Sequence, residues 1–434
     1  MGKFKFSPLD ISLMFLGLVF LVVDIVLDVL AVVNFYQEKS YVSLSVLILL
    51  LVGSSLLVQA FSWLWYRYEE SERDQEEKSM NQTKVEKCLS RSHMKLLHVL
   101  QLGIYFRHAG VVEMSLCSAY SQVKDSEGFA VYMIHDLSML RLIETFSESA
   151  PQLVLMITIM LQGQLDPITV LKAVGSMSAI ALSVTMYHRS MRSFLPDKEK
   201  QQLISSVVYF LWNLLLISSR LTALALFASV LPCFIFTHFL CSWLVLFFFL
   251  WRSKTDFMSS PCGEWLYRAT VALIWYFDWF NALKGRTRYK TMVYHGYILV
   301  DISVLCSLWC WKMITDTPLF EVQLHAVIAA VTVVAVYILG LVFKMIYYRC
   351  YHPNLSKEEL KGDDTKGPPV DEQRLMICEI PSEDVVDLSI DDLEEDNVRF
   401  RDLNDEDRSI PAQPAPEIKR CNKRMRKLAE NFYS

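Results

Sequence analysis

The stretch DLSMLRLIETFSESAPQ, residues 136–152, places charged side chains inside a predominantly apolar sequence. On an α-helix, four of its polar residues fall within about 80° of one another and form one polar stripe. These residues are Arg141, Glu144, Glu148 and Gln152. Each ionised group near the centre of a bilayer costs about 2.5–3.5 kcal/mol on insertion scales, so such a stripe needs partners or a water-filled cavity.

Two interpretations of this stripe differ in what its acids do. A pair of Arg141 with one glutamate would only fix the packing of the helix. A second carboxylate one turn from Glu144 is repulsive, however, which favours a functional site. In such a site the two acids share a proton or face something hydrated. Asp136 lies well off the stripe, and we expect it to have a different role.

The rest of the chain is that of a polytopic membrane protein. It has 434 residues, of which 53% are hydrophobic and 12% aromatic, and its mean hydropathy is +0.29. This is too apolar for a soluble protein of the same size. Seven apolar runs are long enough to cross a bilayer as helices. They are residues 11–33, 42–65, 170–188, 203–229, 231–251, 291–311 and 324–348. We expect the first to be a retained span rather than a signal peptide.

Lysine and arginine in the loops predict the orientation of these spans. Residues 66–95 are rich in both, so by the positive-inside rule this segment and the N-terminus should be cytoplasmic. The loops at 189–200, 252–254 and 284–290 are also basic and should lie on the same side. That arrangement requires two further segments to enter and leave the membrane on one side.

We therefore predict two re-entrant or interfacial helices, at about residues 93–108 and 264–283, both interrupted by charge. In the rival topology each segment crosses once, which would leave the KGRTRYK loop, residues 284–290, outside.

The predicted fold is an all-α polytopic membrane protein with about eight transmembrane helices and two partial helices. The eighth span is the charged segment at about residues 130–162. The order span, span, partial helix, span, span then occurs twice along the chain. This suggests two parallel internal repeats. The first membrane half would comprise residues 1–188 and the second residues 189–352.

Other charged residues interrupt the spans. Asp10, Asp24 and Asp28 share one face of the first span, within about 40°. Arg220, in the span that begins at residue 203, is a plausible counter-ion for one of these acids, and Asp301 adds a further acid. Some of these groups could instead be paired elements of helix packing.

Residues 353–434 form a cytosolic tail that is acidic and mostly disordered by composition. Its Asp384–Asp387 has the DxxD spacing that a caspase could cut between Asp387 and Leu388, with Asp405 and Glu406 as a second candidate. The tail ends in a basic amphipathic segment, residues 418–434, which could lie on anionic lipid or dock on the protein's cytosolic face.

Several function classes find no support. The sequence has no nucleotide-binding loop, no metalloprotease motif and no serine-hydrolase elbow. Its ten cysteines do not have the spacing of a metal site. We therefore expect no metal, no cofactor, no nucleic-acid partner and no enzyme activity.

Six blocks together resemble the XK-related family. They are FSWLW at 61–65, LSMLRLIETFSESAPQL at 137–153, SSVVYFLWNLLLISSR at 205–220, TDFM at 255–258, EWLYR at 264–268 and GRTR at 285–288. The resemblance covers residues from about 10 to 352 and looks closest to the family's apoptosis-activated phospholipid scramblase branch. It implies eight spans and two partial helices, which agrees with the charge count. It also implies caspase activation and a single-span immunoglobulin-type accessory subunit, neither of which the residues show.

This resemblance predicts an energy-independent phospholipid scramblase of the plasma membrane that exposes phosphatidylserine after caspases cut an inhibitory tail, with both termini cytoplasmic. The polar residues that would form or frame a lipid path are Asp10, Asp24, Asp28, Arg141, Glu144, Glu148, Gln152, Arg220 and Asp301. An ion-coupled solute transporter would also use intramembrane acids and broken helices. A membrane scaffold whose charges pair with a partner subunit is a third alternative.

Overall fold

The computed structural model describes residues 8–75, 90–120, 124–163, 167–194, 202–253, 255, 257–258, 260–282, 288–316 and 320–351. Every regular element within these ranges is a helix. By its contacts the chain divides into one unit of residues 1–355 and 422–434 and another of residues 356–421, and all described residues belong to the first. Seven helices in the described ranges are long and apolar enough to span a membrane. The prediction of an all-α polytopic membrane protein is confirmed.

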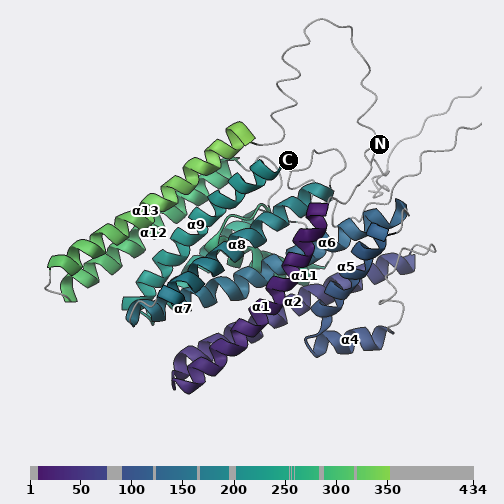
Figure 1. Cartoon of the computed structure of the whole chain (residues 1–434), viewed down its shortest axis with the longest axis horizontal. Helices are drawn as coiled ribbons and strands as arrows, with labels where there is room; N and C mark the ends of the chain where they lie inside the picture. Colours follow the sequence, from purple (N-terminus) through teal and green to yellow (C-terminus); the bar gives the residue numbers. More distant parts are fainter. Residues whose placement is uncertain are drawn as a thin grey trace, which may run out of the picture. The chain divides into compact units, whose positions relative to one another are not determined.

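The helices follow the predicted order (Figure 1). The first membrane half contains α1 (Pro8–Gln37), α2 (Tyr41–Gln75), α4 (Arg91–Val99), α5 (Gly103–Tyr120), α6 (Lys124–Glu144), the π-helical turn η1 (Thr145–Ser149), α7 (Ala150–Gln162) and α8 (Pro167–Phe194). The second contains α9 (Leu203–Val230), α10 (Phe234–Arg252), α11 (Pro261–Phe277), α12 (Arg288–Asp316), α13 (Phe320–Ile346) and a second π-helical turn, η2 (Tyr347–Tyr351). Whether the halves are related as parallel repeats stays a prediction.

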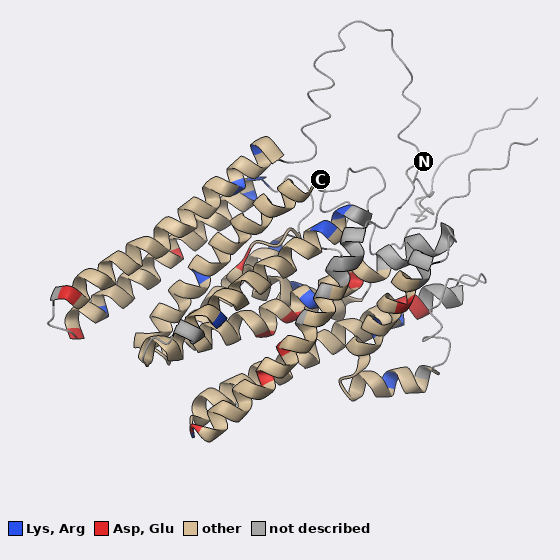
Figure 2. Ribbon diagram, viewed as in Figure 1, with Lys and Arg blue, Asp and Glu red and all other residues tan. Residues whose placement is uncertain are grey.

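Helix α9 lies at the centre of the described bundle. It packs against α7, α8, α12 and α13, and 67% of its span is buried, compared with 28% or less for the other six candidate spans. The other spans keep apolar side chains on their surfaces, as lipid-facing helices do. Charged residues are sparse on the long helices, but acidic residues interrupt the otherwise tan ribbon of α1 (Figure 2).

The first predicted partial helix is wrong in its boundaries. Residues 93–108 are not one helix, because the chain breaks between α4 and α5 at Gln101, whose φ is 63°. Side chains of α2 fix this turn: Gln59 Nε2 donates to Gln101 O at 2.9 Å, and Ser55 Oγ donates to Gln101 Oε1 at 2.6 Å. Arg107 therefore does not end a helix but lies inside α5.

The second predicted partial helix, residues 264–283, overlaps α11 but ends too late, because α11 stops at Phe277. The carboxyl end of α11 lies beside the interiors of two spans, because Tyr276 O accepts from Arg220 of α9 and Trp275 O accepts from Tyr294 of α12. The chain then reaches the start of α12 at Arg288. A helix of 17 residues that stops at mid-bundle fits a re-entrant element better than a full crossing.

The charged segment predicted as a span is one nearly continuous rod of α6, η1 and α7. Pro151, in the first turn of α7, has no backbone N–H, and its ring would clash with the carbonyl four residues earlier in a regular α-helix. The wider π-helical turn just before it relieves that conflict. The proposed cleavage residues Asp387, Leu388, Asp405 and Glu406 and the basic segment 418–434 lie outside the described residues.

Candidate functional site

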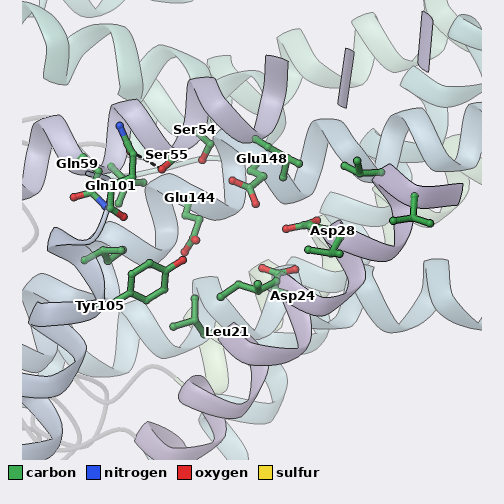
Figure 3. Close-up of a pocket in the computed structure, with 17 residues that line it drawn as sticks. Leu21, Asp24, Asp28, Ser54, Ser55, Gln59, Gln101, Tyr105, Glu144 and Glu148 are labelled. Carbon is green, nitrogen blue, oxygen red and sulfur yellow. Dashed lines mark hydrogen bonds between the residues drawn. The ribbon is translucent and has the colours of Figure 1, made fainter. Parts of the chain in front are cut away.

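A polar cavity of about 310 Å³ opens between α1, α2, α5, α6 and η1 (Figure 3). Its volume is at the lower end of the range typical of small-molecule sites. Nine polar residues line it: Asp24, Asp28, Ser54, Ser55, Gln59, Gln101, Tyr105, Glu144 and Glu148. Apolar side chains of α1, such as Ile25 and Val29, complete the wall and are themselves exposed.

The acids of this cavity come from two helices that face each other. Arg141 bridges them, with its Nη1 3.1 Å from Glu144 Oε2 and 4.0 Å from Asp24 Oδ2. One turn beyond Asp24, Asp28 Oδ1 accepts a hydrogen bond at 2.8 Å from Nε2 of Gln152, which lies eight residues after Glu144. The sequence-predicted stripe of α6 and α7 is thus brought against the acidic face of α1.

Glu148 is the most deeply placed of these acids. Glu148 is 8% exposed, and no cationic side chain among the described residues forms an ion pair with it. Four carboxylates therefore share one guanidinium, that of Arg141. This excess of negative charge in a membrane helix bundle favours a hydrated cavity or a ligand that carries donors. Asp10 lies in the first turn of α1, and its side chain is outside the described residues.

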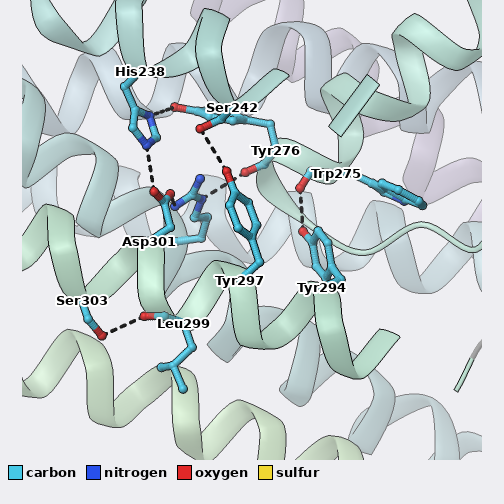
Figure 4. A network of polar contacts seen from close by, with 10 residues as sticks. His238, Ser242, Trp275, Tyr276, Tyr294, Tyr297, Leu299, Asp301 and Ser303 are labelled. Atoms are coloured by element: carbon cyan, nitrogen blue, oxygen red, sulfur yellow. Dashed lines mark hydrogen bonds and ion pairs between the residues drawn. The ribbon is translucent and has the colours of Figure 1, made fainter. Parts of the chain in front are cut away.

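Asp301 of α12 lies in a second polar cluster (Figure 4). Arg220 of α9 forms an ion pair with it. Its Nε donates to Tyr276 O at 3.0 Å. The expectation that Arg220 balances an acid of the first span is wrong. Helix α9 turns this residue toward α11 and α12, whereas α1 packs mainly against α2.

His238 of α10 completes the second cluster. Its Nε2 lies 3.1 Å from Asp301 Oδ1, and its Nδ1 lies 2.9 Å from the Tyr276 hydroxyl. A carboxylate can only accept, so Nε2 carries the hydrogen and, in the neutral ring, Nδ1 accepts from Tyr276. The cluster joins α9, α10, α11 and α12, and it shares no residue with the cavity of Figure 3.

A third cluster explains why Asp136 lies off the stripe. Arg107 of α5 lies 3.6 Å from Asp136 Oδ2 and 3.8 Å from Glu69 Oε1. Its Nε donates to Ser62 Oγ at 2.9 Å, and Ser62 Oγ lies 2.9 Å from His98 Nε2. His98 Nδ1 lies 2.9 Å from Met94 O, so Nδ1 donates and Nε2 accepts from Ser62. Burial lowers the pKa of His98, which keeps the ring neutral for this role.

The sequence interpretation missed one further cation inside the bundle, the half-buried Lys344 of α13. Its Nζ donates to His295 Nε2 at 2.7 Å and lies 5.3 Å from the centroid of the Trp212 ring. His295 Nδ1 is 2.9 Å from the Tyr337 hydroxyl. A lysine near the end of an apolar run is usually interpreted as an interfacial residue, so only the contacts with His295 and Trp212 reveal that Lys344 points into the bundle.

Comparison with known proteins gives the family. A family model described as XK-related protein matches residues 12–353. The chain is 40% identical to an "XK-related protein 8" of Tetraodon nigroviridis, over 99% of this chain and 98% of that protein. It is 43% identical to one of Gasterosteus aculeatus, over 81% of this chain and 86% of the other. The identity to one of Pan troglodytes is 35%, over 80% and 84%. The chain belongs to the XK-related family.

Proposed function

Starting from its membership of the XK-related family, we propose that this chain is an energy-independent phospholipid scramblase of the plasma membrane. The observation that carries the proposal is the polar cavity between α1, α2, α5, α6 and η1, which holds four carboxylates in a bundle of membrane helices. The acids and the guanidinium would form part of the path along which lipid head groups move.

The physical argument concerns the head group alone. A lipid crosses a bilayer slowly because its charged head group must leave water, whereas its tails can stay in hydrocarbon throughout. Charged and hydrogen-bonding side chains at mid-membrane lower that barrier. Exposed Ile25 and Val29 border the same cavity, so acyl tails could remain outside on α1 while the head group lies inside.

Both ends of a head group find partners in this site. Carboxylates such as Glu148 and Asp28 can accept hydrogen bonds from an ammonium group, and Arg141 can donate to a phosphate. Arg220 and Asp301 lie in the separate cluster of Figure 4, so we assign them to holding the helices that frame the path rather than to lining it.

We further propose that the tail controls this activity. The acidic tail, residues 353–434, would keep the protein inactive until a caspase cuts it during apoptosis, between Asp387 and Leu388 or else between Asp405 and Glu406. Scrambling would then expose phosphatidylserine. With both termini cytoplasmic, the tail would meet caspases directly, and a single-span immunoglobulin-type subunit is the expected partner.

Reconstitution of the purified full-length chain into liposomes tests this function. Fluorescent lipids in the inner leaflet should become accessible to external dithionite without any ion gradient, and faster once the tail is cut after Asp387. An ion-coupled solute transporter would instead give saturable, gradient-driven uptake of a soluble substrate. A scaffold would give no transport in either assay, and that result for cut protein would refute the proposal.

A further inference from the structure

The π-helical turn η1 changes which way the acidic stripe points. In a regular α-helix, residues four apart drift by about 40°, so Gln152 would lie about 80° from Glu144. One extra residue in the π-helical turn rotates all later residues back by about 100° about the helix axis. Gln152 then lies within about 20° of Glu144. The turn thereby brings Glu144 and Gln152 back to one face of the rod, with Glu144 beside Arg141 and Gln152 on Asp28 of α1.

Side-chain hydroxyls stabilise the widened turn from within. Thr145 Oγ1 donates to Arg141 O at 2.8 Å, and Ser147 Oγ donates to Ile143 O at 2.8 Å. Both bonds supply partners to carbonyls at the point where the regular α-helical bonding pattern is interrupted. The sequence TFSES thus carries its own replacement donors, one turn before Pro151.

A serine of α2 fixes the same turn from outside. Ser54 Oγ lies 2.7 Å from Ser147 Oγ, and Ser147 directly precedes Glu148 in the π-helical turn. Because the hydroxyl of Ser147 donates to Ile143 O, Ser54 is the donor in the serine pair. Ser54 is buried, and both Ser54 and Glu148 line the cavity. One short contact therefore joins α2 to the π-helical turn that carries Glu148.

We propose that Ser54 and Ser147 are positioning residues, which lock the π-helical turn and thereby present Glu148 to the cavity. The inference rests on the proposed function insofar as Glu148 is part of the lipid path. It adds that the path depends on a single irregular turn, and that the serine pair acts only through Glu148.

A pair of measurements on the full-length protein tests the proposal. The first is lipid scrambling in liposomes by Ser54→Ala and Ser147→Ala, with Ser147→Thr as the conservative variant that keeps the hydroxyl. Loss of one net hydrogen bond predicts a rate about fivefold lower for each alanine variant, and recovery in Ser147→Thr. Ser178→Ala is the matched control, since Ser178 makes the same type of bond to Val174 O on α8, away from the cavity.

The same substitutions are then made in Glu148→Gln. If the serines act through Glu148, Ser54→Ala and Ser147→Ala will not slow this variant further. An equal slowing in both backgrounds would overturn the inference, because it would assign the serines a general structural role.

The second measurement does not depend on lipid transport. In Glu148→Cys, the rate at which a water-soluble methanethiosulfonate modifies residue 148 is followed by mass spectrometry. Adding Ser54→Ala or Ser147→Ala should lower that rate about fivefold, since the side chain then leaves the cavity for part of the time. An unchanged rate would contradict the positioning role. If no variant transports lipid, wild type included, the proposed function fails, and the labelling rates still decide the inference.

Discussion

The effect of the buried charge of Arg220 on the stability of the protein depends on its partner. The residue is 1% exposed, and Asp301 is its only counter-ion among the described residues. Removing one member of a buried pair leaves the other uncompensated, which typically costs about 3–5 kcal/mol. We expect Arg220→Met and Asp301→Asn each to lower the thermal stability of the purified protein by that order, and the double variant to regain much of it.

The control for this prediction is Lys312→Met. Lys312 and Asp316 form an exposed pair on α12, which should contribute less than about 1 kcal/mol. Thermal unfolding in detergent, followed by tryptophan fluorescence, measures all four variants. A double variant no more stable than either single one would contradict the assignment of Arg220 to Asp301.

At the scale of residues, helical periodicity was enough to group side chains of one helix, whereas the role of that group stays a prediction. The 100° spacing placed Arg141, Glu144, Glu148 and Gln152 on one stripe, and the structure brings that stripe to the acids of α1. The pairing of Arg220 could not be predicted in this way. Helical periodicity says which residues of one helix share a face, but not which neighbouring helix that face meets.

The turn between α4 and α5 shows how a small element depends on packing. A Cβ atom at Gly103 would lie 2.5 Å from His98 Cδ2 and 2.7 Å from Gln59 Oε1. Neither neighbour can move freely, because His98 is hydrogen-bonded through both ring nitrogens and Gln59 binds Gln101 O. We expect Gly103→Ala to destabilise the protein by about 1–3 kcal/mol, as overpacking of a filled site does.

Two other glycines are matched controls for that substitution. Gly53 and Gly175 lie within α2 and α8, and a Cβ atom at either would meet nothing within 4 Å. Alanine there should leave stability unchanged or raise it by less than about 1 kcal/mol. Thermal unfolding would contradict this account if Gly103→Ala were as stable as the control variants.

At the scale of elements, the sequence predicted the spans better than the irregular segments. Long apolar runs identify membrane helices because the bilayer sets their length. The break at Gln101 was missed because the side chains that stabilise it, Gln59 and Ser55, come from α2. Pro151 accounts for the π-helical turn near Glu148, because its ring and missing N–H disfavour a regular α-helix there.

Contacts at the helix ends agree with the predicted directions of the helices relative to one another. Ser205 Oγ, at the start of α9, donates to Tyr351 O at the end of η2, which follows α13, and Gln162 Nε2, at the end of α7, donates to Ser229 O near the end of α9. These contacts place the start of α9 beside the end of η2 and the end of α7 beside the end of α9; that the first of these two sides faces the cytosol stays a prediction.

Labelling of intact cells tests this topology. Tyr289, at the start of α12, is 76% exposed, and Lys39 lies in the exposed turn between α1 and α2. A membrane-impermeant maleimide should modify Lys39→Cys from outside, and Tyr289→Cys only after permeabilisation. Modification of Tyr289→Cys from outside would show that the segment of α11 crosses the membrane once.

For the whole molecule, the charge count in the loops gives an order of spans and partial helices, because it depends only on which side each basic loop occupies. The side on which each loop lies stays a prediction. The boundaries of the polar cavity required the structure, since α1 and η1 are far apart in sequence. The regulatory role of the tail remains a proposal from the sequence.

The most direct test of the account is the scrambling rate of Asp28→Asn/Glu148→Gln in liposomes. Neither acid has an ion-pair partner among the described residues, so the double substitution neutralises two acids of the cavity without breaking an ion pair. With its tail cut, the wild-type chain should let dithionite bleach inner-leaflet lipids. We predict that the folded double variant does so at least about tenfold more slowly, a barrier higher by about 1.4 kcal/mol. An unchanged rate in folded protein would contradict the claim that lipid head groups pass through this cavity.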